Sequence, residues 1–598
     1  MPFPYEQAGA IGNIDSPFWL CLLVSEEVSA VATTVSTLPD PEARPGTMDD
    51  RRAQMYPILT DAQLEELSTH GSEESFARGE LLWDVGDRNT CFYVVLEGEL
   101  EIVRRDAFGN DTALVVHRRG SYAGETTLLS GRAAMVAGRA GMDLTVLSIP
   151  VERLRELMVI HAQLGELIMR SFILRRVRMI TDQVSDLLLV GSRHSADTMR
   201  LQDFLTRNGQ PYKFFDLETS GDMCALLSRC DYGPDDTPLV ITSKGEPLKN
   251  PSLRALASRL GLSVALDAQR VHDVAVIGAG PAGLAAAVYA ASEGLDVIVV
   301  DSVAPGGQAG TSSKIENYLG FPTGISGQAL AGRAFMQAQK FGAQIEIPAR
   351  LTQLACGNPF HELELDNGER IRSRTVVIAS GARYRKPALE RLEAFEGAGV
   401  YYGATYLESR LCHGQEVAIV GGGNSAGQAA VFLAESAEKV YVLVRSEGLA
   451  ASMSQYLIRR IETTKNIELL TWTEVVELEG MSQVEAVRWR NAKTMAQTVR
   501  PVKHLFVFIG AAPNSEFIAG SIAMDANGFI CTGSEVTRPE SEQPWTLSRP
   551  PYPLETSCPG IFAVGDVRAT STKRVASAVG EGSTVVQFVH QTLSRGSV

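Results

Sequence analysis

A glycine turn between a predicted strand and a predicted helix constrains the fold of this chain more than any other feature. In HDVAVIGAGPAGLAAAVYAASEGLDVIVVD, Gly278, Gly280 and Gly283 follow an apolar strand and precede an alanine-rich helix. The first glycine permits a tight turn, the second lets the backbone approach a diphosphate, and the third lets helix and strand pack closely. Asp301 ends the next predicted strand, where a carboxylate can bind ribose hydroxyls. The segment therefore predicts a doubly wound α/β domain with a dinucleotide at the helix N-terminus.

A second turn of the same kind begins at Gly421. The segment VAIVGGGNSAGQAAVFLA again joins a strand to a helix, and its next strand, KVYVLVRS, ends in Arg445 instead of an acid. An acid there repels a 2′-phosphate and an arginine pairs with it, so this turn favours NADP(H). The alternative is a surface arginine at a strand end. The residues predicted to bind the nicotinamide dinucleotide are Gly421, Gly423, Asn424, Ser425, Ala426 and Arg445.

Composition excludes several classes of protein. The 598 residues carry a net charge of −15, which disfavours nucleic acid and anionic lipid as partners. Eight cysteines without any C-x-x-C spacing argue against a disulfide-stapled scaffold and favour a reducing cytoplasm. No apolar run reaches the ~18–20 residues of a membrane-spanning helix, and the nine histidines form no metal-binding spacing. We therefore expect a cytoplasmic protein with no metal site, no membrane segment and no nucleic-acid partner.

The pattern of the sequence changes several times, and its length predicts roughly three to five folding units. Short β-rich runs between about 72 and 150 predict a small antiparallel barrel, followed by a long helical pattern. Alternating strands and helices between about 190 and 266 predict a compact α/β unit. The predicted divisions are a disordered tail or start-site artefact (1–50), the barrel with its helices (51–187), the α/β unit (188–266) and three C-terminal parts (271–387, 388–512 and 513–598).

From about 271 to 598 the chain resembles the low-molecular-weight thioredoxin reductase family of flavoproteins. The segments that carry the resemblance are GAGPAG, PGGQ, IENYLGFP, IASGA, GGGNSA, FIGAAPN, GIFAVGDVR and KRVASAVGEG, in the family's order. The resemblance implies that the first and last C-terminal parts bind FAD, that the middle part binds NAD(P)H, and that the chain forms a homodimer. It also implies that Asp566 binds the flavin's ribitol chain and that Arg574–Ala576 run along the isoalloxazine. The FAD-binding residues implied in this way are Gly278, Gly280, Pro281, Ala282, Gly283, Asp301, Gly307, Gln308, Asn317, Gly381, Gly565, Asp566, Arg574, Val575 and Ala576.

One departure from this family bears directly on function. The family has a C-A-T-C pair before the second glycine turn, and the corresponding run here, YYGATYLESRLCHGQEVAIV, has Gly403 and Tyr406 in its place. Cys412 lies six residues further on without a partner at redox spacing, and a disulfide needs Cα atoms roughly 4.4–6.8 Å apart. Tyr406 either packs against the flavin or lies on the surface. Because hydride passes directly between cofactors, we expect no catalytic side chain.

The middle α/β unit resembles a thioredoxin- or glutaredoxin-like domain. Its redox position reads Ser192-Arg193-His194-Ser195, without sulfur. Cys224 and Cys230 fall six residues apart on a predicted helix, ~9 Å along its axis, which is too far for a mutual disulfide. We expect a structural or docking module.

The N-terminal barrel resembles the cyclic-nucleotide-binding fold, through GELLWDVGDRNTCFYVVLEGELEIV and GETTLLSGRAAMV. The resemblance implies that Gly124 and Glu125 meet the ribose of a cyclic nucleotide and that Arg132 pairs with its phosphate. Arg132 follows Glu125 by seven residues, about two short of the usual cassette. Either the loop is trimmed yet functional, or the barrel is only structural.

These observations lead to one expected function and two rivals. We expect an FAD-dependent NAD(P)H oxidoreductase, with NADPH as cofactor and NADH as its alternative, acting on an unidentified small-molecule or redox-protein acceptor and regulated through the barrel. The first rival is a thioredoxin-disulfide reductase that uses non-family cysteines or a partner's dithiol. The second is a flavin-based redox sensor or interaction protein, which would show flavin reduction without rapid turnover.

Overall fold

The computed structural model describes residues 48–88, 91–105, 111–124, 126–182, 185, 187–219, 232–242, 246–263, 266–481, 483–537 and 545–594. The chain divides into two compact units. The first comprises the residues up to Arg193 together with Gln210–Gly261, and the second comprises His194–Gly209 together with Leu262–Val598. A short segment of the predicted middle domain thus belongs to the same unit as the C-terminal parts.

The first unit begins with two four-stranded antiparallel sheets, in the orders β1–β8–β3–β6 and β2–β7–β4–β5. Phe92, Tyr122 and Phe172 pack against one another in the core and are fully buried. The strands are β1 (Ser72–Phe76), β2 (Leu81–Trp83), β3 (Phe92–Glu97), β4 (Leu100–Arg105), β5 (Asp111–His117), β6 (Tyr122–Ala123), β7 (Ala137–Ala140) and β8 (Leu144–Ile149). The helices are α2 (Met48–Met55), α3 (Asp61–Ser68), α4 (Thr126–Ser130), α5 (Val151–Ile160) and α6 (Ala162–Thr181).

The rest of the first unit is a small mixed sheet in the order β10–β9–β11–β12. β9 and β10 run parallel, whereas β11 is antiparallel to both of its neighbours. The elements are β9 (Leu188–Gly191), β10 (Lys213–Asp216), β11 (Leu239–Ile241), β12 (Leu248–Lys249) and α9 (Leu253–Arg259). The predicted helix with Cys224 and Cys230 lies outside the described residues.

The second unit contains a largely parallel sheet built on the first glycine turn. Its apolar strands are buried on both faces, as parallel sheets covered by helices require. In the order β15–β14–β13–β18–β17–β16, with β29 also paired to β18, the strands are β13 (Val271–Ile277), β14 (Val297–Val300), β15 (Gln344–Glu346), β16 (Leu351–Ala355), β17 (His361–Leu365), β18 (Arg370–Ile378) and β29 (Ile561–Ala563). The helices are α10 (Pro281–Ser292), α11 (Gly327–Lys340) and α16 (Val575–Ser594), together with α7 (Ala196–Arg207) from the N-terminal side.

Small residues let the helices of this unit approach closely. A Cβ at Gly582 of α16 would lie 2.1 Å from the Ala282 carbonyl oxygen of α10, so only glycine fits this crossing. A Cβ at Gly283 would lie 1.8 Å from the Gly278 carbonyl oxygen. The third glycine of the motif therefore serves helix–strand packing, as predicted.

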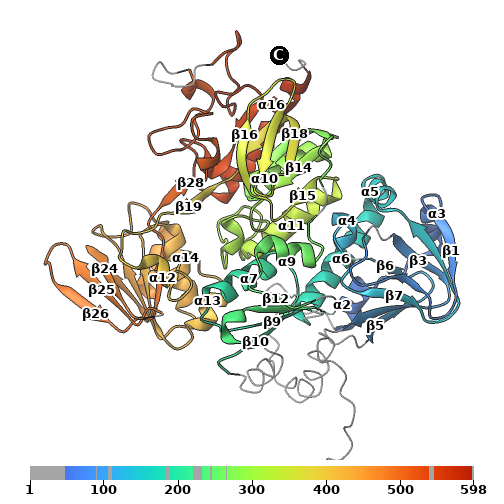
Figure 1. The fold of residues 1–598 in the computed structure, drawn as a ribbon, viewed down its shortest axis with the longest axis horizontal. Coiled ribbons are helices and arrows are strands. Elements are labelled where there is room, and N and C mark those ends of the chain that lie inside the picture. Colours follow the sequence, from blue (N-terminus) through green and yellow to red (C-terminus); the bar gives the residue numbers. More distant parts are fainter. Residues whose placement is uncertain are drawn as a thin grey trace, which may run out of the picture. The chain divides into compact units, whose positions relative to one another are not determined.

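A second parallel sheet follows, in the order β20–β27–β21–β22–β23, beside a three-stranded antiparallel sheet β24–β25–β26. The short pair β19–β28 joins the two crossing connections between this part and the first sheet (Figure 1). The strands are β19 (Ala382–Tyr384), β20 (Val400–Tyr401), β21 (Glu416–Val420), β22 (Lys439–Leu443), β23 (Ile467–Leu470), β24 (Thr473–Glu479), β25 (Ala486–Asn491), β26 (Gln497–Arg500), β27 (His504–Val507) and β28 (Ala511–Pro513). The helices are α12 (Leu392–Phe395), α13 (Tyr406–Leu411), α14 (Asn424–Leu433) and α15 (Gln455–Thr463). Two doubly wound dinucleotide-type sheets in one unit confirm the predicted multidomain α/β class.

Among the described residues, none of the helices combines the length and apolar character that crossing a membrane would take.

Candidate functional site

A cavity of about 570 Å³ opens at the carboxyl ends of the parallel strands in the second unit. Ligands of doubly wound sheets bind at this edge, and the volume lies within the usual range of ligand sites. Eleven of the residues predicted to bind FAD line it: Gly278, Gly280, Pro281, Ala282, Asp301, Gly307, Gln308, Gly381, Asp566, Arg574 and Val575. The first glycine turn, the PGGQ loop and the start of α16 therefore meet around one space, although they lie far apart in sequence.

Four predicted residues do not line this cavity. Gly283 packs against the strand, as described above, and the Gly565 N–H donates to Glu581 at 2.7 Å. Asn317 and Ala576 are exposed at the surface. A motif locates a loop but does not fix which of its side chains faces the cavity.

The carboxylate of Asp301 holds the first glycine turn in place. It accepts the backbone N–H of Ala279 at 2.8 Å, and its other oxygen accepts those of Val303 and Ala304 at 2.9 and 3.2 Å. The residue thus joins two loops of the cavity wall. A carboxylate has about four acceptor positions, so the three bonds leave room for a further donor.

The other end of the cavity combines Asp566 with the start of α16. Burial raises the pKa of Asp566, and the nearby Lys573 ammonium opposes that shift. The Lys573 Nζ donates to the Asp566 carbonyl oxygen at 2.7 Å. Arg574 and Val575 at the helix start also line the cavity, where the helix dipole favours negative charge.

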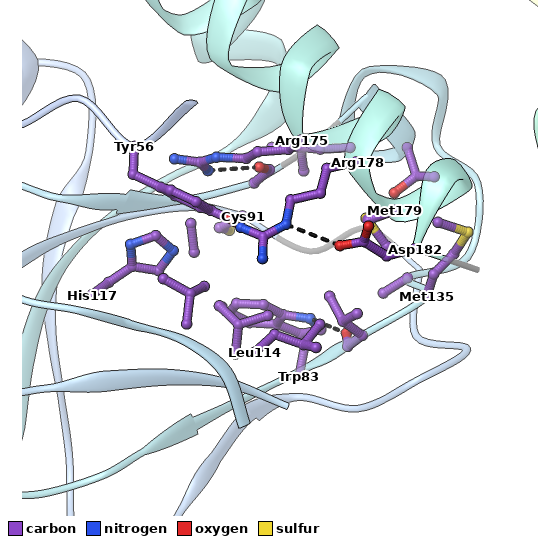
Figure 2. Close-up of a pocket in the computed structure, with 18 residues that line it drawn as sticks. Tyr56, Trp83, Cys91, Leu114, His117, Met135, Arg175, Arg178, Met179 and Asp182 are labelled. Carbon is purple, nitrogen blue, oxygen red and sulfur yellow. Dashed lines mark hydrogen bonds and ion pairs between the residues drawn. The ribbon is translucent and has the colours of Figure 1, made fainter. Parts of the chain in front are cut away.

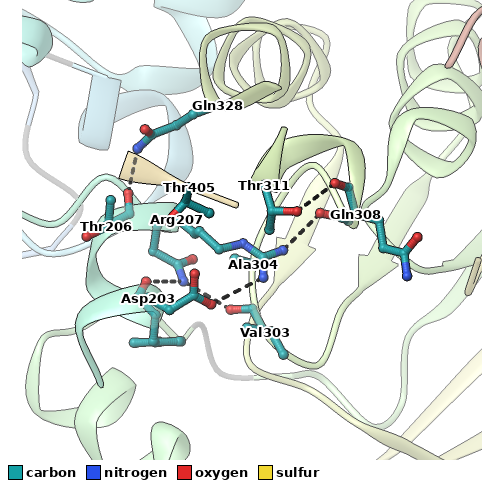
Figure 3. Close-up of polar contacts among 12 residues, drawn as sticks. Asp203, Thr206, Arg207, Val303, Ala304, Gln308, Thr311, Gln328 and Thr405 are labelled. Carbon is teal, nitrogen blue, oxygen red and sulfur yellow. Dashed lines mark hydrogen bonds and ion pairs between the residues drawn. The ribbon is translucent and has the colours of Figure 1, made fainter. Parts of the chain in front are cut away.

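Sequence reasoning missed several polar residues of the wall. Asp203 and Arg207 come from α7, and Arg207 donates to the Gly307 carbonyl oxygen at 3.1 Å and pairs with Asp203 at 3.3 Å (Figure 3). Glu408 of α13 accepts the Thr405 N–H at 2.8 Å, and burial raises its pKa. No local pattern marks these residues, because they reach the cavity only through the folding of distant segments.

The positions of the missing cysteine pair fall at this cavity and beside it. Gly403 lines it, and a Cβ there would lie 3.8 Å from the Thr311 hydroxyl oxygen. Tyr406 is 52% exposed and lies outside the lining, with Arg410 at 6.0 Å from its ring centroid, which favours the surface alternative. Cys412 is fully buried in the core of the second sheet, and burial raises its pKa well above the ordinary value.

One pair of thiols does lie in contact elsewhere in this unit. The Cys356 and Cys558 side chains hydrogen-bond to each other. Cys356 follows β16 and Cys558 precedes β29, which places the pair at the start of β29, whereas the cavity lies beyond its end. Neither cysteine lines the cavity.

The second glycine turn has the same local structure as the first. Gly421 has a φ of 142°, and a Cβ there would lie 2.3 Å from the Phe508 carbonyl oxygen. Gly423 caps α14, Ala426 is fully buried beneath it, and the Asn424 side chain accepts the Ser454 N–H at 2.8 Å. Ser425 hydrogen-bonds to Tyr384 beside the cavity, and Arg445 is exposed just after β22.

The N-terminal domain has a cavity of its own, of about 110 Å³, with an apolar wall that includes Trp83 and Met135 (Figure 2). Gly124 lines it, Glu125 lies outside the described residues, and Arg132 is buried without lining it. Instead, Arg175 of α6 donates to the Gly124 and Tyr122 carbonyl oxygens at 2.9 and 3.1 Å.

His117, which lines this cavity, should make the stability of the barrel sensitive to acid. Burial, and secondarily the charge of Arg175, lowers its pKa from 6.5 to about 3. Below pH 6.5 the imidazole of the unfolded chain therefore binds a proton, whereas that of the native barrel does not. The free energy of unfolding of the barrel thus falls from pH 6.5 towards pH 3. At pH 5 the loss is about 2 kcal/mol for this residue. Hydrogen exchange of β5 at pH 7.5 and 5 should show it, and His117→Gln should remove that part of the pH dependence; an unchanged dependence would contradict the assignment.

Two family models match the chain. The Pyridine nucleotide-disulphide oxidoreductase family model matches residues 272–582, and the Cyclic nucleotide-binding domain model matches residues 73–161. The thioredoxin reductase of Mycoplasmopsis pulmonis is 34% identical over 316 residues, which are 52% of this chain and 95% of the relative. That of Mycolicibacterium smegmatis is 31% identical over 322 residues, 52% of this chain and 94% of the relative.

The solved thioredoxin reductase of Lactococcus lactis covers 54% of this chain and 99% of its own, with a TM-score of 0.49 and 26% identity. The family match covers more than half of the chain, and the first relative is spanned almost completely. The chain therefore belongs to the pyridine nucleotide-disulphide oxidoreductase family, as an NAD(P)H-dependent flavoprotein oxidoreductase that also carries a cyclic nucleotide-binding domain.

Proposed function

We propose that this protein takes a hydride from NADPH onto FAD and passes the electrons to an acceptor without a dithiol of its own chain in between. The observation that carries the proposal is Gly403, which lines the cavity where the resemblance calls for a cysteine. The side chain at the other cysteine position, Tyr406, lies outside the lining. The acceptor must then meet the cofactor directly, as a small molecule or as the redox group of a partner protein.

The residues of the cavity suit FAD. Gly280 and Gly307 face each other closely, since a Cβ on Gly307 would lie 3.1 Å from the Gly280 Cα, and larger residues would fill the space for a diphosphate. We assign the diphosphate to the N–H groups at the start of α10, the ribose to Asp301, and the ribitol and ring to Asp566 and the start of α16. Bound FAD supplies the hydride and electron chemistry, and the protein binds, orients and shields it.

The second glycine turn is assigned to NADPH. The start of α14 would receive its diphosphate, and Arg445 its 2′-phosphate. The β19–β28 pair is the connection about which the two parts of the unit would change orientation so that the nicotinamide meets the flavin. An ion pair of Arg460 with Glu316, at 2.8 Å, holds the described orientation across these parts.

The barrel is assigned a regulatory role with a cyclic nucleotide as its ligand. A cavity of about 110 Å³ is smaller than the usual ~300–1,000 Å³ of ligand sites, so Arg175 and the neighbouring Tyr56 would have to move to admit one. The segment of α7 links this domain along the chain to the wall of the FAD cavity. Regulation would then act on cofactor binding or turnover, and the protein would work as a homodimer in the cytoplasm.

An acceptor screen with the purified holoprotein tests this function. NADPH oxidation should be rapid with at least one quinone, oxygen or one-electron redox protein, and should not require thioredoxin. Turnover with thioredoxin alone would favour the thioredoxin reductase activity for which the relatives are named. That activity would use a dithiol of the partner or cysteines outside the family positions. Flavin reduction without turnover by any acceptor would favour a redox sensor.

A further inference from the structure

Helix α7 is attached to the wall of the FAD cavity although it lies outside the family match, which begins at residue 272. Three hydrogen bonds hold its C-terminal end (Figure 3). Asn208 donates to the Val303 carbonyl oxygen at 3.0 Å, Gln328 donates to that of Thr206 at 2.8 Å, and Arg207 donates to that of Gly307 at 3.1 Å. The end of this helix therefore has a fixed position against the loop that follows β14.

Arg207 reaches the glycine turn through this loop. Its guanidinium bonds to Gly307, whose backbone lies against Gly280, the residue that caps α10. Its side chain is 17% exposed, and its buried Nε–H has no acceptor among the residues that the structure describes. Because Arg207 also lines the cavity, its guanidinium places a positive charge beside the expected position of a diphosphate.

The charges around the cavity make this cation important. Four carboxylates line the wall, those of Asp203, Asp301, Glu408 and Asp566, and a diphosphate would add further negative charge. Of the four lining cations, Lys386 pairs with Glu396 at 2.7 Å and Arg383 pairs with Glu516, which leaves Arg207 and Arg574 to offset the charge of the wall. Arg207 has only Asp203 as its ionic partner in the described wall, at 3.3 Å.

We propose that Arg207 is a further FAD-binding residue, supplied by α7 from outside the reductase fold, whose guanidinium binds the diphosphate of the dinucleotide. The inference rests on the proposed function, in which this cavity holds FAD. The part of the chain that precedes residue 272 would then complete the cofactor site as well as regulate it.

The test is a titration of apoprotein of the full chain with FAD, followed by flavin fluorescence. Arg207→Gln should weaken binding about 10- to 150-fold, the range of a charged hydrogen bond. Arg207→Met, which keeps the apolar stem, should do the same and serves if the first variant does not fold. Circular-dichroism melting of each apoprotein checks folding.

Two further variants separate charge from mere support of the loop. Asn208→Ala removes the bond to Val303 but no charge, and it should change the affinity less than threefold. Asp203→Asn removes a neighbouring negative charge, and it should leave the affinity unchanged or raise it. Weakening by Asn208→Ala as large as that by Arg207→Gln would overturn the inference, because both would then act through loop support. Equal weakening by Asp203→Asn would overturn it too, because binding would then depend on the ion pair and not on the positive charge.

The outcomes for the two proposals differ. Wild-type protein that binds no FAD contradicts the proposed function itself. If the wild-type protein binds FAD and Arg207→Gln and Arg207→Met both bind it with an affinity within twofold of the wild-type value, only the role of Arg207 is contradicted.

Discussion

NADPH should reduce the flavin about 10- to 150-fold faster than NADH at limiting concentration, and Arg445→Glu should remove the preference. The physical reason is a charged contact between Arg445 and the 2′-phosphate, worth about 1.5–3 kcal/mol. Arg445 is exposed just beyond β22, where such a contact is accessible. The neighbouring Ser446 and Ala450 add no cation, so the value should lie towards the lower end. Stopped-flow reduction at 450 nm measures both rates.

Lys439 offers a matched control for this result. It lies at the other end of the same strand and pairs with Glu468 at 2.6 Å, so Lys439→Gln should leave the preference intact. Equal rates with NADPH and NADH in the unmutated protein would remove the role assigned to Arg445. That outcome would support the alternative of a surface arginine.

Wild-type protein should purify yellow with about one FAD per chain, and Asp301→Ala should purify colourless. The substitution leaves three backbone N–H groups without their carboxylate acceptor, those of Ala279, Val303 and Ala304. Each unmet donor costs about 1–3 kcal/mol, and the glycine turn loses its shape, so FAD affinity should fall at least about 100-fold. The ratio of flavin to protein absorbance measures retention.

Asp296 provides the comparison for this variant, because it directly precedes β14 whereas Asp301 directly follows it. Asp296 pairs with Arg270 at 2.8 Å, away from the cavity lining, and Asp296→Asn should retain the flavin. A yellow Asp301→Ala protein with unchanged FAD affinity would show that the glycine turn does not depend on this carboxylate.

The glycine turns could be predicted from sequence because their chemistry is local. A strand, three small residues at fixed spacing and a helix determine where Gly278, Gly280 and Gly283 lie relative to one another. The structure brings the first two to the cavity and buries the third in the packing that its spacing predicted. For Asn317 the same kind of motif gave only the loop, and the side chain lies exposed.

The polar wall contributed by α7 could not be predicted in this way. Arg207 and Gly307 are 100 residues apart, and nothing in ADTMRLQDFLTR distinguishes an arginine at a cavity from one in solvent. Its position depends on tertiary packing between segments that share no repeat or motif. The contact of Cys356 with Cys558 is of the same kind, since each cysteine is isolated in sequence.

The interpretation of the cysteine positions depends on the sequence and on the structure together. Sequence alone identified the replacements at Gly403 and Tyr406, but it left two positions open for the tyrosine side chain, against the flavin or on the surface. Its 52% exposure, outside the cavity lining, favours a surface residue, and the burial of Cys412 leaves that thiol remote from solvent and from exchange with a partner. For the barrel, Gly124 lies at the cavity, whereas Arg132 is buried away from its lining.

The number of electrons taken up per flavin tests the central claim most directly. In an anaerobic titration with dithionite, the holoprotein should consume two electrons per FAD and stop, because no dithiol of the chain exchanges with the cofactor. Cys412→Ser, Cys356→Ser and Cys558→Ser should leave that count unchanged. Uptake of four electrons per FAD, reduced to two by any of these three substitutions, would contradict the account and establish an internal disulfide reductase.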